Sequence, residues 1–210
     1  MKEKFLWVLV AALCFGLVSC SYAAWQRPAI RLTQGYRYDM RHDDHDLYIT
    51  RVACGLNYQK EDAWPVSIAP FFEIRKNFER ELTERIEAGI EFGIKPFSWF
   101  YIGESIQGVW LKEDYGANYT HNKRRDSAEA ETRLVVTHKL FDVGKTEIKG
   151  FALDEYTFDL DIGASSRNEL ALGVLIPLNK HIETQFNWRH IDRIHDYDSD
   201  VLEAAVTVVF

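Results

Sequence analysis

Histidine and aspartate gather in two stretches of the chain, residues 41–46 and 190–200. Imidazole nitrogens and carboxylate oxygens are suitable ligands for divalent cations. Because the stretches are far apart in sequence, they can form a cation site only if the fold brings them together. Five candidate ligands define that hypothetical site: His42, His45, His190, Asp192 and His195. The alternative is an acidic rim that binds water and no specific ion.

Arginine and glutamate recur at alternate positions in several other segments. In a β-strand, alternate residues share a face, so these charged side chains would point to one side of a sheet. A buried charge is costly unless an opposite charge compensates it, so we expect Arg–Glu pairs between neighbouring strands. The residues expected to line this charged interior are Arg51, Arg75, Arg85, Glu87, Glu91, Arg133, Glu183 and Arg189.

The elements that would position these residues are ten segments in which apolar and polar residues alternate. They cover residues 29–39, 47–58, 64–75, 81–95, 99–112, 128–140, 146–159, 168–178, 181–191 and 201–210. Pro70 predicts a bulge or a weakened ladder in the third segment. Less regular alternation predicts bulges near Glu104 and near residues 154–155. Residues 80–90 could also form a helix, but alternation that continues to Ile94 favours a strand.

The last segment, residues 201–210, indicates how the strands are arranged. Its alternate residues Leu202 to Phe210 form a wholly apolar face, and it ends on an aromatic residue, as do the closing strands of bacterial outer-membrane barrels. Hydrocarbon cannot satisfy backbone polar groups, so strands cross a bilayer only as a closed barrel. Short and long connections alternate between the segments, as they do in such barrels. We therefore predict an all-β fold: a closed, antiparallel, up-and-down transmembrane β-barrel of about ten strands, with both termini in the periplasm.

Aromatic residues near the predicted strand ends fit two interfacial belts. One group lies near the short connections (Tyr58, Trp64, Trp99, Phe210), and the other lies toward the long ones (Tyr38, Tyr48, Trp110, Trp188). The alternative is a soluble sandwich or lipocalin-like barrel, whose apolar residues would point inward.

The first residues of the chain are typical of a targeting signal. Lys2 and Lys4 precede an apolar run at residues 5–18, which is shorter than the ~20 residues of a membrane helix. We predict a signal peptide at residues 1–23 and one barrel domain at residues 24–210. The alternative is a lipobox that ends at Cys20 and gives a lipid-anchored protein. Either signal predicts export in a Gram-negative bacterium, with the outer membrane as the destination.

Composition limits the possible partners. A formal net charge of −7 argues against nucleic acid, whose binders need a basic face. Once the signal is removed, Cys54 is the only cysteine, so we expect no internal disulfide and a packing role for this residue. We expect outer-membrane lipid and lipopolysaccharide as partners, a monomeric barrel, and no cofactor apart from the hypothetical divalent cation.

Part of the sequence resembles a family of small bacterial outer-membrane barrels of unknown function. The resemblance lies in residues 154–160 (DEYTFDL), in 167–170 (RNEL) continuing through Gly173, and in a further strand pair up to Phe210. A weaker similarity occurs at residues 101–105, and Thr157 departs from the large apolar residue expected there. The resemblance implies the barrel fold and assembly by the usual periplasmic chaperones and barrel-assembly machinery. It implies no activity.

Three functions remain open at this point. Eight strands give a lumen that side chains just fill, whereas about 16–18 strands are needed for an aqueous channel. Ten strands therefore favour a structural or binding barrel of porin-like architecture with a side-chain-filled lumen. A narrow path for ions or small solutes is one alternative. The other is a lipid A hydrolase, with His190, Asp192 and Ser199 as its candidate residues, although the spacing does not ensure that a nucleophile lies beside its base.

Overall fold

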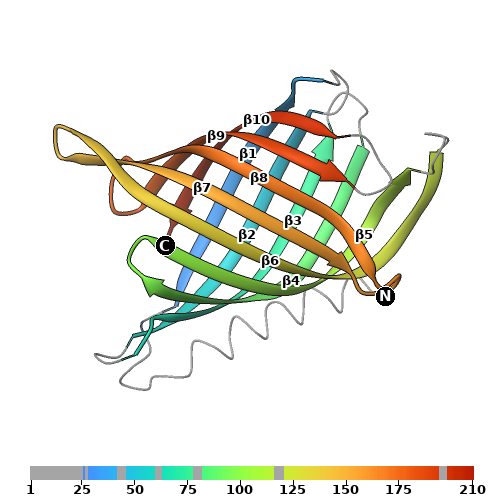
Figure 1. Ribbon diagram of the computed structural model, residues 1–210, viewed down its shortest axis with the longest axis horizontal. Helices are drawn as coiled ribbons and strands as arrows, with labels where there is room; N and C mark the ends of the chain where they lie inside the picture. Colours follow the sequence, from blue (N-terminus) through green and yellow to red (C-terminus); the bar gives the residue numbers. More distant parts are fainter. Residues whose placement is uncertain are drawn as a thin grey trace.

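The computed structural model is a closed antiparallel β-barrel (Figure 1). The structure describes residues 26, 28–41, 46–59, 63–77, 82–115, 121–193 and 198–210. Ten strands lie within these ranges: β1 (Ala29–Asp39), β2 (Leu47–Tyr58), β3 (Val66–Asn77), β4 (Leu82–Phe97), β5 (Phe100–Tyr115), β6 (His121–Val143), β7 (Thr146–Asp159), β8 (Ala164–Pro177), β9 (Ile182–Arg193) and β10 (Ser199–Val209). Among the described residues, no helix is long and apolar enough to span a bilayer. The predicted signal peptide, including Cys20, lies outside the described residues.

The barrel closes by pairing its first and last strands. The register between β1 and β10 runs from Arg31 opposite Val209 to Asp39 opposite Val201. The Phe210 amide extends this ladder by donating to the Ile30 carbonyl at 2.9 Å. All other strands pair with their neighbours in sequence. No strand edge is left open, so the backbone polar groups of the wall can pair with one another.

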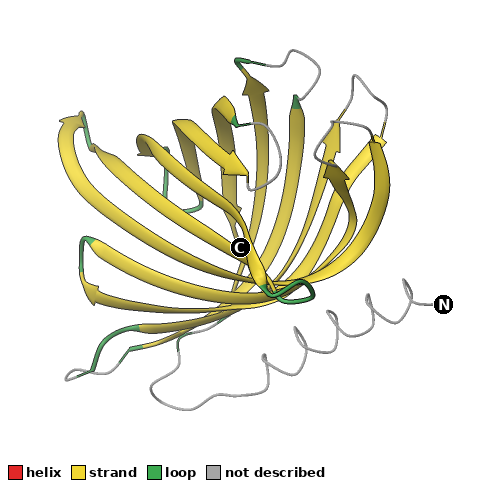
Figure 2. Ribbon diagram, turned by 45° about the vertical axis from the view of Figure 1, so that its right-hand side comes forward, coloured by secondary structure: helices red, strands yellow, loops and turns green. Residues whose placement is uncertain are grey.

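Connections lie only at the two ends of the barrel (Figure 2). At one end, here called the short-turn end, tight turns such as 98–99 and 144–145 join the strands. Gly144 has φ of 63°, a conformation that favours glycine and suits a tight turn. The opposite end, called the long-loop end, carries the connections after β1, β3, β5, β7 and β9. The predicted alternation of short and long connections holds only in part, because the β2–β3 connection at residues 59–65 is as long as the β1–β2 connection at 40–46, whereas β3–β4 and β7–β8 are joined by only four residues each.

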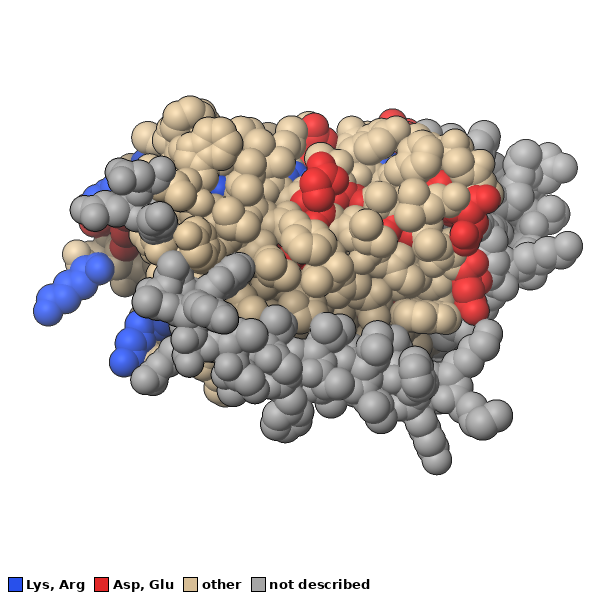
Figure 3. Space-filling model, turned by 90° about the horizontal axis from the view of Figure 1, so that it is seen from below, with Lys and Arg blue, Asp and Glu red and all other residues tan. Residues whose placement is uncertain are grey.

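Apolar side chains point out of the barrel, as predicted. Large hydrophobic residues are exposed at outward positions on most strands, including Val52, Ile106, Leu134, Leu172, Phe186 and Val206. Figure 3 shows a largely uncharged wall, with cationic side chains at one end, acidic ones at the other, and a small acidic group in the middle. A soluble barrel would place its apolar side chains inward, so this orientation contradicts the soluble alternative.

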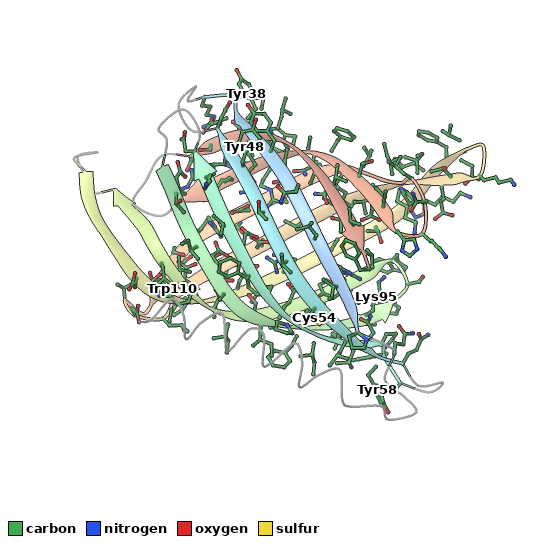
Figure 4. The ribbon with its side chains drawn as sticks, turned by 180° about the vertical axis from the view of Figure 1, so that it is seen from behind. Tyr38, Tyr48, Cys54, Tyr58, Lys95 and Trp110 are labelled. Atoms are coloured by element: carbon green, nitrogen blue, oxygen red, sulfur yellow. The ribbon has the colours of Figure 1, made fainter. Side chains whose placement is uncertain are left out.

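Aromatic side chains lie near both ends of the wall. In Figure 4, Tyr38 and Tyr48 lie toward the long-loop end, while Tyr58 lies at the opposite end. Phe210 is 71% exposed at the short-turn end. Amphipathic rings favour the interface between hydrocarbon and water, so this distribution suits a membrane-spanning wall.

Several predicted details of the strands were wrong. The register is regular through Glu104 and through residues 154–155, where we had expected bulges. The irregularities lie elsewhere, for example between Lys139 and Phe141 and between Thr157 and Phe158. The weakened ladder predicted at Pro70 is observed. On the side of β3 that faces β2, Phe71 and Ile68 are paired but Ala69 and Pro70 are not, and the register is the same on both sides of this gap. A proline lacks an amide proton, which accounts for the interruption.

The predicted long loop at residues 113–127 is mostly strand. β5 continues to Tyr115 and β6 begins at His121, and the two strands remain paired across this region. Charged residues made this region appear to be a loop. However, a two-stranded ribbon that extends beyond a bilayer can be polar on both faces, because water surrounds it.

Candidate functional site: charged residues across the lumen

Charged side chains meet inside the barrel because strand alternation directs them there. Inward positions on β6 and β7, for example, hold Glu129, Glu131, Arg133 and Glu155, whereas the intervening residues point outward. The register places Arg133 opposite Glu155, and the Arg133 Nε donates to Glu155 Oε2 at 2.8 Å.

Arg133 also connects strands that are not neighbours in the wall. Its Nη2 donates to Glu131 at 2.8 Å, and its Nη1 donates to Glu91 on β4 at 3.1 Å. Glu91 accepts from Arg51 on β2 at 3.2 Å and from the Tyr101 hydroxyl on β5 at 2.5 Å. β2, β4 and β6 are not adjacent, so the ion pairs of Arg51, Glu91 and Arg133 each pass over one intervening strand on the inner side of the wall.

A second cluster forms around Glu169 on β8, whose side chain is 0% exposed. Arg167 Nε lies 2.9 Å from Glu169 Oε1, and Arg189 donates to Glu169 Oε2. Arg37 on β1 approaches Glu169 at 3.7 Å and donates to Glu203 at 2.5 Å. One carboxylate is therefore surrounded by three guanidinium groups.

Further pairs extend the network over β2, β3, β4 and β6, and Arg167 approaches Glu131 at 3.8 Å and Glu155 at 4.0 Å, which joins the two clusters. Arg75 Nε donates to Glu73 at 2.7 Å and Arg75 Nη2 lies 3.1 Å from Glu87. Glu73 also pairs with Arg51 at 3.3 Å, and Arg85 pairs with Glu87 and Glu129. The Arg51 guanidinium lies 3.9 Å above the centre of the Phe71 ring, a cation–π contact.

Together these residues form one continuous structure, here called the ionic network. Within the described part of the chain, its charged members are Arg37, Arg51, Arg75, Arg85, Arg133, Arg167, Arg189, Glu73, Glu87, Glu91, Glu129, Glu131, Glu155, Glu169 and Glu203. Nine strands contribute charged members to the ionic network, and β5 contributes the uncharged Tyr101 hydroxyl, which donates to Glu91. Opposite charges alternate along the network, which offsets the high cost of burying each ion.

Glycines allow the Tyr101 ring to lie against the wall. A Cβ at Gly93 would collide with the Tyr101 ring and the Ser67 hydroxyl, and a Cβ at Gly103 would press on the same ring. The Tyr101 ring therefore lies over two positions that must lack a side chain, and this placement brings its hydroxyl to Glu91.

Burial of the inward side chains differs between the two ends. Toward the long-loop end they are buried, as at Asp39, Asn77, Val109, Asp159 and Ser199. Toward the short-turn end they are mostly small and only partly buried, as at Thr33, Ala53, Ala69, Gly173 and Ala205. The ionic network lies between these regions, so the lumen is filled from its middle to the long-loop end.

The structure places most of the predicted lumen residues in the ionic network. Arg51, Arg75, Arg85, Glu87, Glu91, Arg133 and Arg189 belong to it, whereas Glu183 is exposed near the start of β9. Our set of site residues omitted eight members of the network: Glu73, Glu129, Glu131, Glu203, Arg37, Arg167, Glu155 and Glu169. Alternation through residues 151–159 and 167–173 could have identified the last three, but the bulge expected at 154–155 hid the pattern.

The predicted cation site cannot be placed in full. His42, His45 and His195 lie outside the described residues. His190 faces outward, and its Nδ1 lies 2.9 Å from Asp200 Oδ1. Asp192 is exposed on the same face of β9. Among the described residues, no group of three or more potential ligands could hold a metal ion. The cation site stays a prediction.

The residues proposed for a hydrolase are not brought together. Ser199 is buried on the inward face of β10 and accepts from Arg193 at 2.8 Å. His190, the candidate base, points to the opposite side of the wall. A nucleophile must lie within hydrogen-bond reach of its base, and these two residues do not.

These features define a class: a closed ten-stranded antiparallel barrel with an apolar exterior and a charged, occupied lumen. No protein-family model matches the chain, and a search of curated proteins found no significant match. The resemblance described above, to small barrels of unknown function, therefore gains no confirmation at the level of a family.

Solved structures with a similar fold are outer-membrane β-barrels. The NanC porin is 12% identical and aligns over 85% of this chain and 98% of its own, with a TM-score of 0.46. The β domain of the Bordetella autotransporter BrkA is 11% identical over 88% of this chain and 99% of its own, with a TM-score of 0.44. An outer membrane channel from Pseudomonas putida F1 is 9% identical and aligns over 92% of this chain and 98% of its own, with a TM-score of 0.37. At these identities no residue role or substrate carries over to this chain.

Proposed function

We propose that this protein is an integral outer-membrane barrel whose lumen is closed at rest by the ionic network, and that it acts as a structural or binding barrel. The observation that carries the proposal is the set of ion pairs between non-adjacent strands, such as Arg51–Glu91–Arg133. An ion that crossed the barrel would have to break these pairs, whose side chains are only partly exposed (21% for Arg51 and Arg133, 15% for Glu91). Separating ion pairs that are largely removed from water is costly. Lipid and lipopolysaccharide would surround the apolar wall, and the barrel-assembly machinery would insert it.

A narrow path for water, ions or small solutes is a second candidate, and one observation favours it. Ser105, Gln107 and Ser127 line β5 and β6 near the long-loop end, and each has a buried side-chain atom with no hydrogen-bond partner among the described residues. Buried polar groups are normally satisfied by protein or water. Water at this wall would form a hydrated strip beside the ionic network.

Conductance across a planar bilayer distinguishes the two candidates. We expect the purified wild-type protein to insert and to show no resolvable single-channel steps. Arg133→Ala removes the cation that holds Glu91, Glu131 and Glu155 together. We expect this variant to show discrete steps with a preference for cations, because three carboxylates then face the lumen with only Arg51 and Arg167 left to compensate them.

Lys139→Ala is the matched control, because Lys139 is an exposed cation of the same strand that pairs outside the network, with Asp142. It should conduct no more than the wild type. Regular steps from the wild-type protein would contradict the closed barrel and favour the narrow path. If Arg133→Ala is recovered poorly, the double variant Arg133→Ala/Glu155→Ala, which removes one charge of each sign, serves the same purpose.

A further inference from the structure

Residues 138–149, here called the β6–β7 hairpin, extend beyond the neighbouring strands at the short-turn end. β6 pairs with β5 as far as Val136, opposite Phe100, and then continues to Val143, which pairs with Thr146 at the start of β7. Figure 1 shows the hairpin in yellow, farther to the left than the turns after β4 and β8. At about 3.3 Å per residue on a strand tilted by about 45°, it projects roughly 10 Å along the barrel axis beyond the start of β5.

The charged side chains of the β6–β7 hairpin lie on its lumen side. Lys139 is the register partner of Lys149, and both continue the inward positions of Arg133 and its strand neighbours. The Lys139 ammonium group lies 2.7 Å from the Asp142 carboxylate and 3.6 Å from that of Glu147. The Lys149 ammonium group lies 3.4 Å from the Glu147 carboxylate. These contacts gather two cations and two anions on one face of the hairpin.

The opposite face of the β6–β7 hairpin is apolar and exposed. Phe141 and Val143 flank Asp142 on the strand and therefore point outward, with exposed fractions of 56% and 61%. Leu140 is 51% exposed and lies against the outward Gly150, where an added Cβ would meet the Leu140 Cδ2 atom at 3.2 Å. The hairpin is therefore amphipathic, with its charges toward the barrel axis and its apolar side chains away from it.

The other end of β6 provides an internal comparison. There β5 and β6 also continue as a paired ribbon, β5 up to Tyr115 and β6 from His121. The sequence of that ribbon is charged, with Lys-Glu-Asp at residues 112–114 and Lys-Arg-Arg-Asp at residues 123–126. Successive residues of a strand belong to opposite faces, so consecutive charges suit a ribbon with water on both sides. The β6–β7 hairpin keeps one apolar face, which indicates an apolar partner on its outer side.

We propose that this partner is lipid, and that the head groups and upper acyl chains of phospholipids in the periplasmic leaflet bind the outer face of the β6–β7 hairpin. This inference rests on the proposed outer-membrane location. The outer face continues into the apolar wall through Val136 and Leu134, which are 40% and 36% exposed. His138 lies between them and the hairpin tip, next to Thr137, whose amide donates to the Trp99 carbonyl at 2.8 Å. A polar ring suits this depth, which is that of the interfacial aromatic residues.

The lipid contact has a consequence for the position of the barrel. An outer face that extends roughly 10 Å beyond the other turns reaches the leaflet when the barrel axis leans toward β6 and β7, as membrane-spanning elements tilt when their apolar surface exceeds the local hydrocarbon thickness. Amphipathic elements at such a surface bury their apolar side among the head groups and upper chains. Lys145, exposed at the hairpin tip, then lies near the lipid phosphate groups.

Fluorescence from single labelled positions in phospholipid vesicles tests the proposal. The chain without its predicted signal peptide carries Cys54→Ala and Val143→Cys, and the new cysteine receives an NBD dye before refolding. We expect blue-shifted emission, strong quenching by lipids that carry a nitroxide on the upper acyl chain, and weak quenching by iodide present on both sides of the bilayer. Asp142→Cys in the same background is the matched control, because it lies beside Val143 on the opposite face. Its dye should be quenched strongly by iodide.

Equal iodide quenching at Val143→Cys and Asp142→Cys overturns the lipid contact. A third chain with Leu172→Cys reports on the membrane location, because Leu172 points outward from the middle of β8. A dye in lipid at Leu172→Cys and in water at Val143→Cys refutes only the hairpin contact. Dyes in water at all three positions refute the membrane location, and the hairpin contact with it.

Discussion

Glu169→Gln is expected to lower the free energy of unfolding by about 3–5 kcal/mol, the usual cost of removing one partner from a buried ion pair. Glutamine has nearly the same size, so the change removes charge and leaves packing almost intact. Arg37, Arg167 and Arg189 all contact the Glu169 carboxylate, which is 0% exposed. Without it, three guanidinium groups crowd together with less compensating charge.

Urea titration of the protein refolded into lipid vesicles measures this effect, with tryptophan fluorescence as the signal. Glu183→Gln is the control, because it makes the same chemical change at an exposed position outside the network. The control should keep the wild-type midpoint. Adding Arg189→Met to Glu169→Gln should recover part of the loss, since it removes one of the uncompensated cations. Equal midpoints for Glu169→Gln and Glu183→Gln would show that the network contributes little to stability.

The sequence predicted the class of fold because membrane barrels require a simple local rule. Each strand must alternate apolar and polar residues, as residues 182–189 do, and this pattern is independent of distant contacts. Strand number, the orientation of the side chains and the closure of β1 on β10 follow from that rule. For the same reason Arg51, Arg85 and Arg133 could be assigned to the interior before any contact was known.

The partners of these arginines could not be predicted, because they depend on register and on the diameter of the barrel. We expected pairs between neighbouring strands, and Arg133–Glu155 is one. Arg133–Glu91 instead passes over β5, and Arg37–Glu169 joins β1 to β8, which only the closure of the barrel brings together. Local sequence also gave the wrong sites for bulges, since an outward carboxylate such as Glu104 looks like a break in alternation although its backbone is regular.

Leu172→Arg is expected to be the most direct test of the membrane location. Leu172 points outward from the middle of β8 and is 51% exposed. In water, an exposed leucine replaced by arginine has little effect on stability. In a bilayer, an arginine on the lipid face near the midplane costs about 2–4 kcal/mol, falling to about 0–1 kcal/mol near the interfaces. The sign and size of the change therefore depend on the medium that contacts the wall.

The matched control is Leu178→Arg, which makes the same substitution at an exposed leucine just beyond the end of β8. Urea unfolding from vesicles should show a large loss for Leu172→Arg and a small one for Leu178→Arg. Equal effects would mean that the apolar wall does not face lipid, and the proposed outer-membrane location would fall with that result. A depth-dependent loss would support a hydrocarbon environment at the middle of β8.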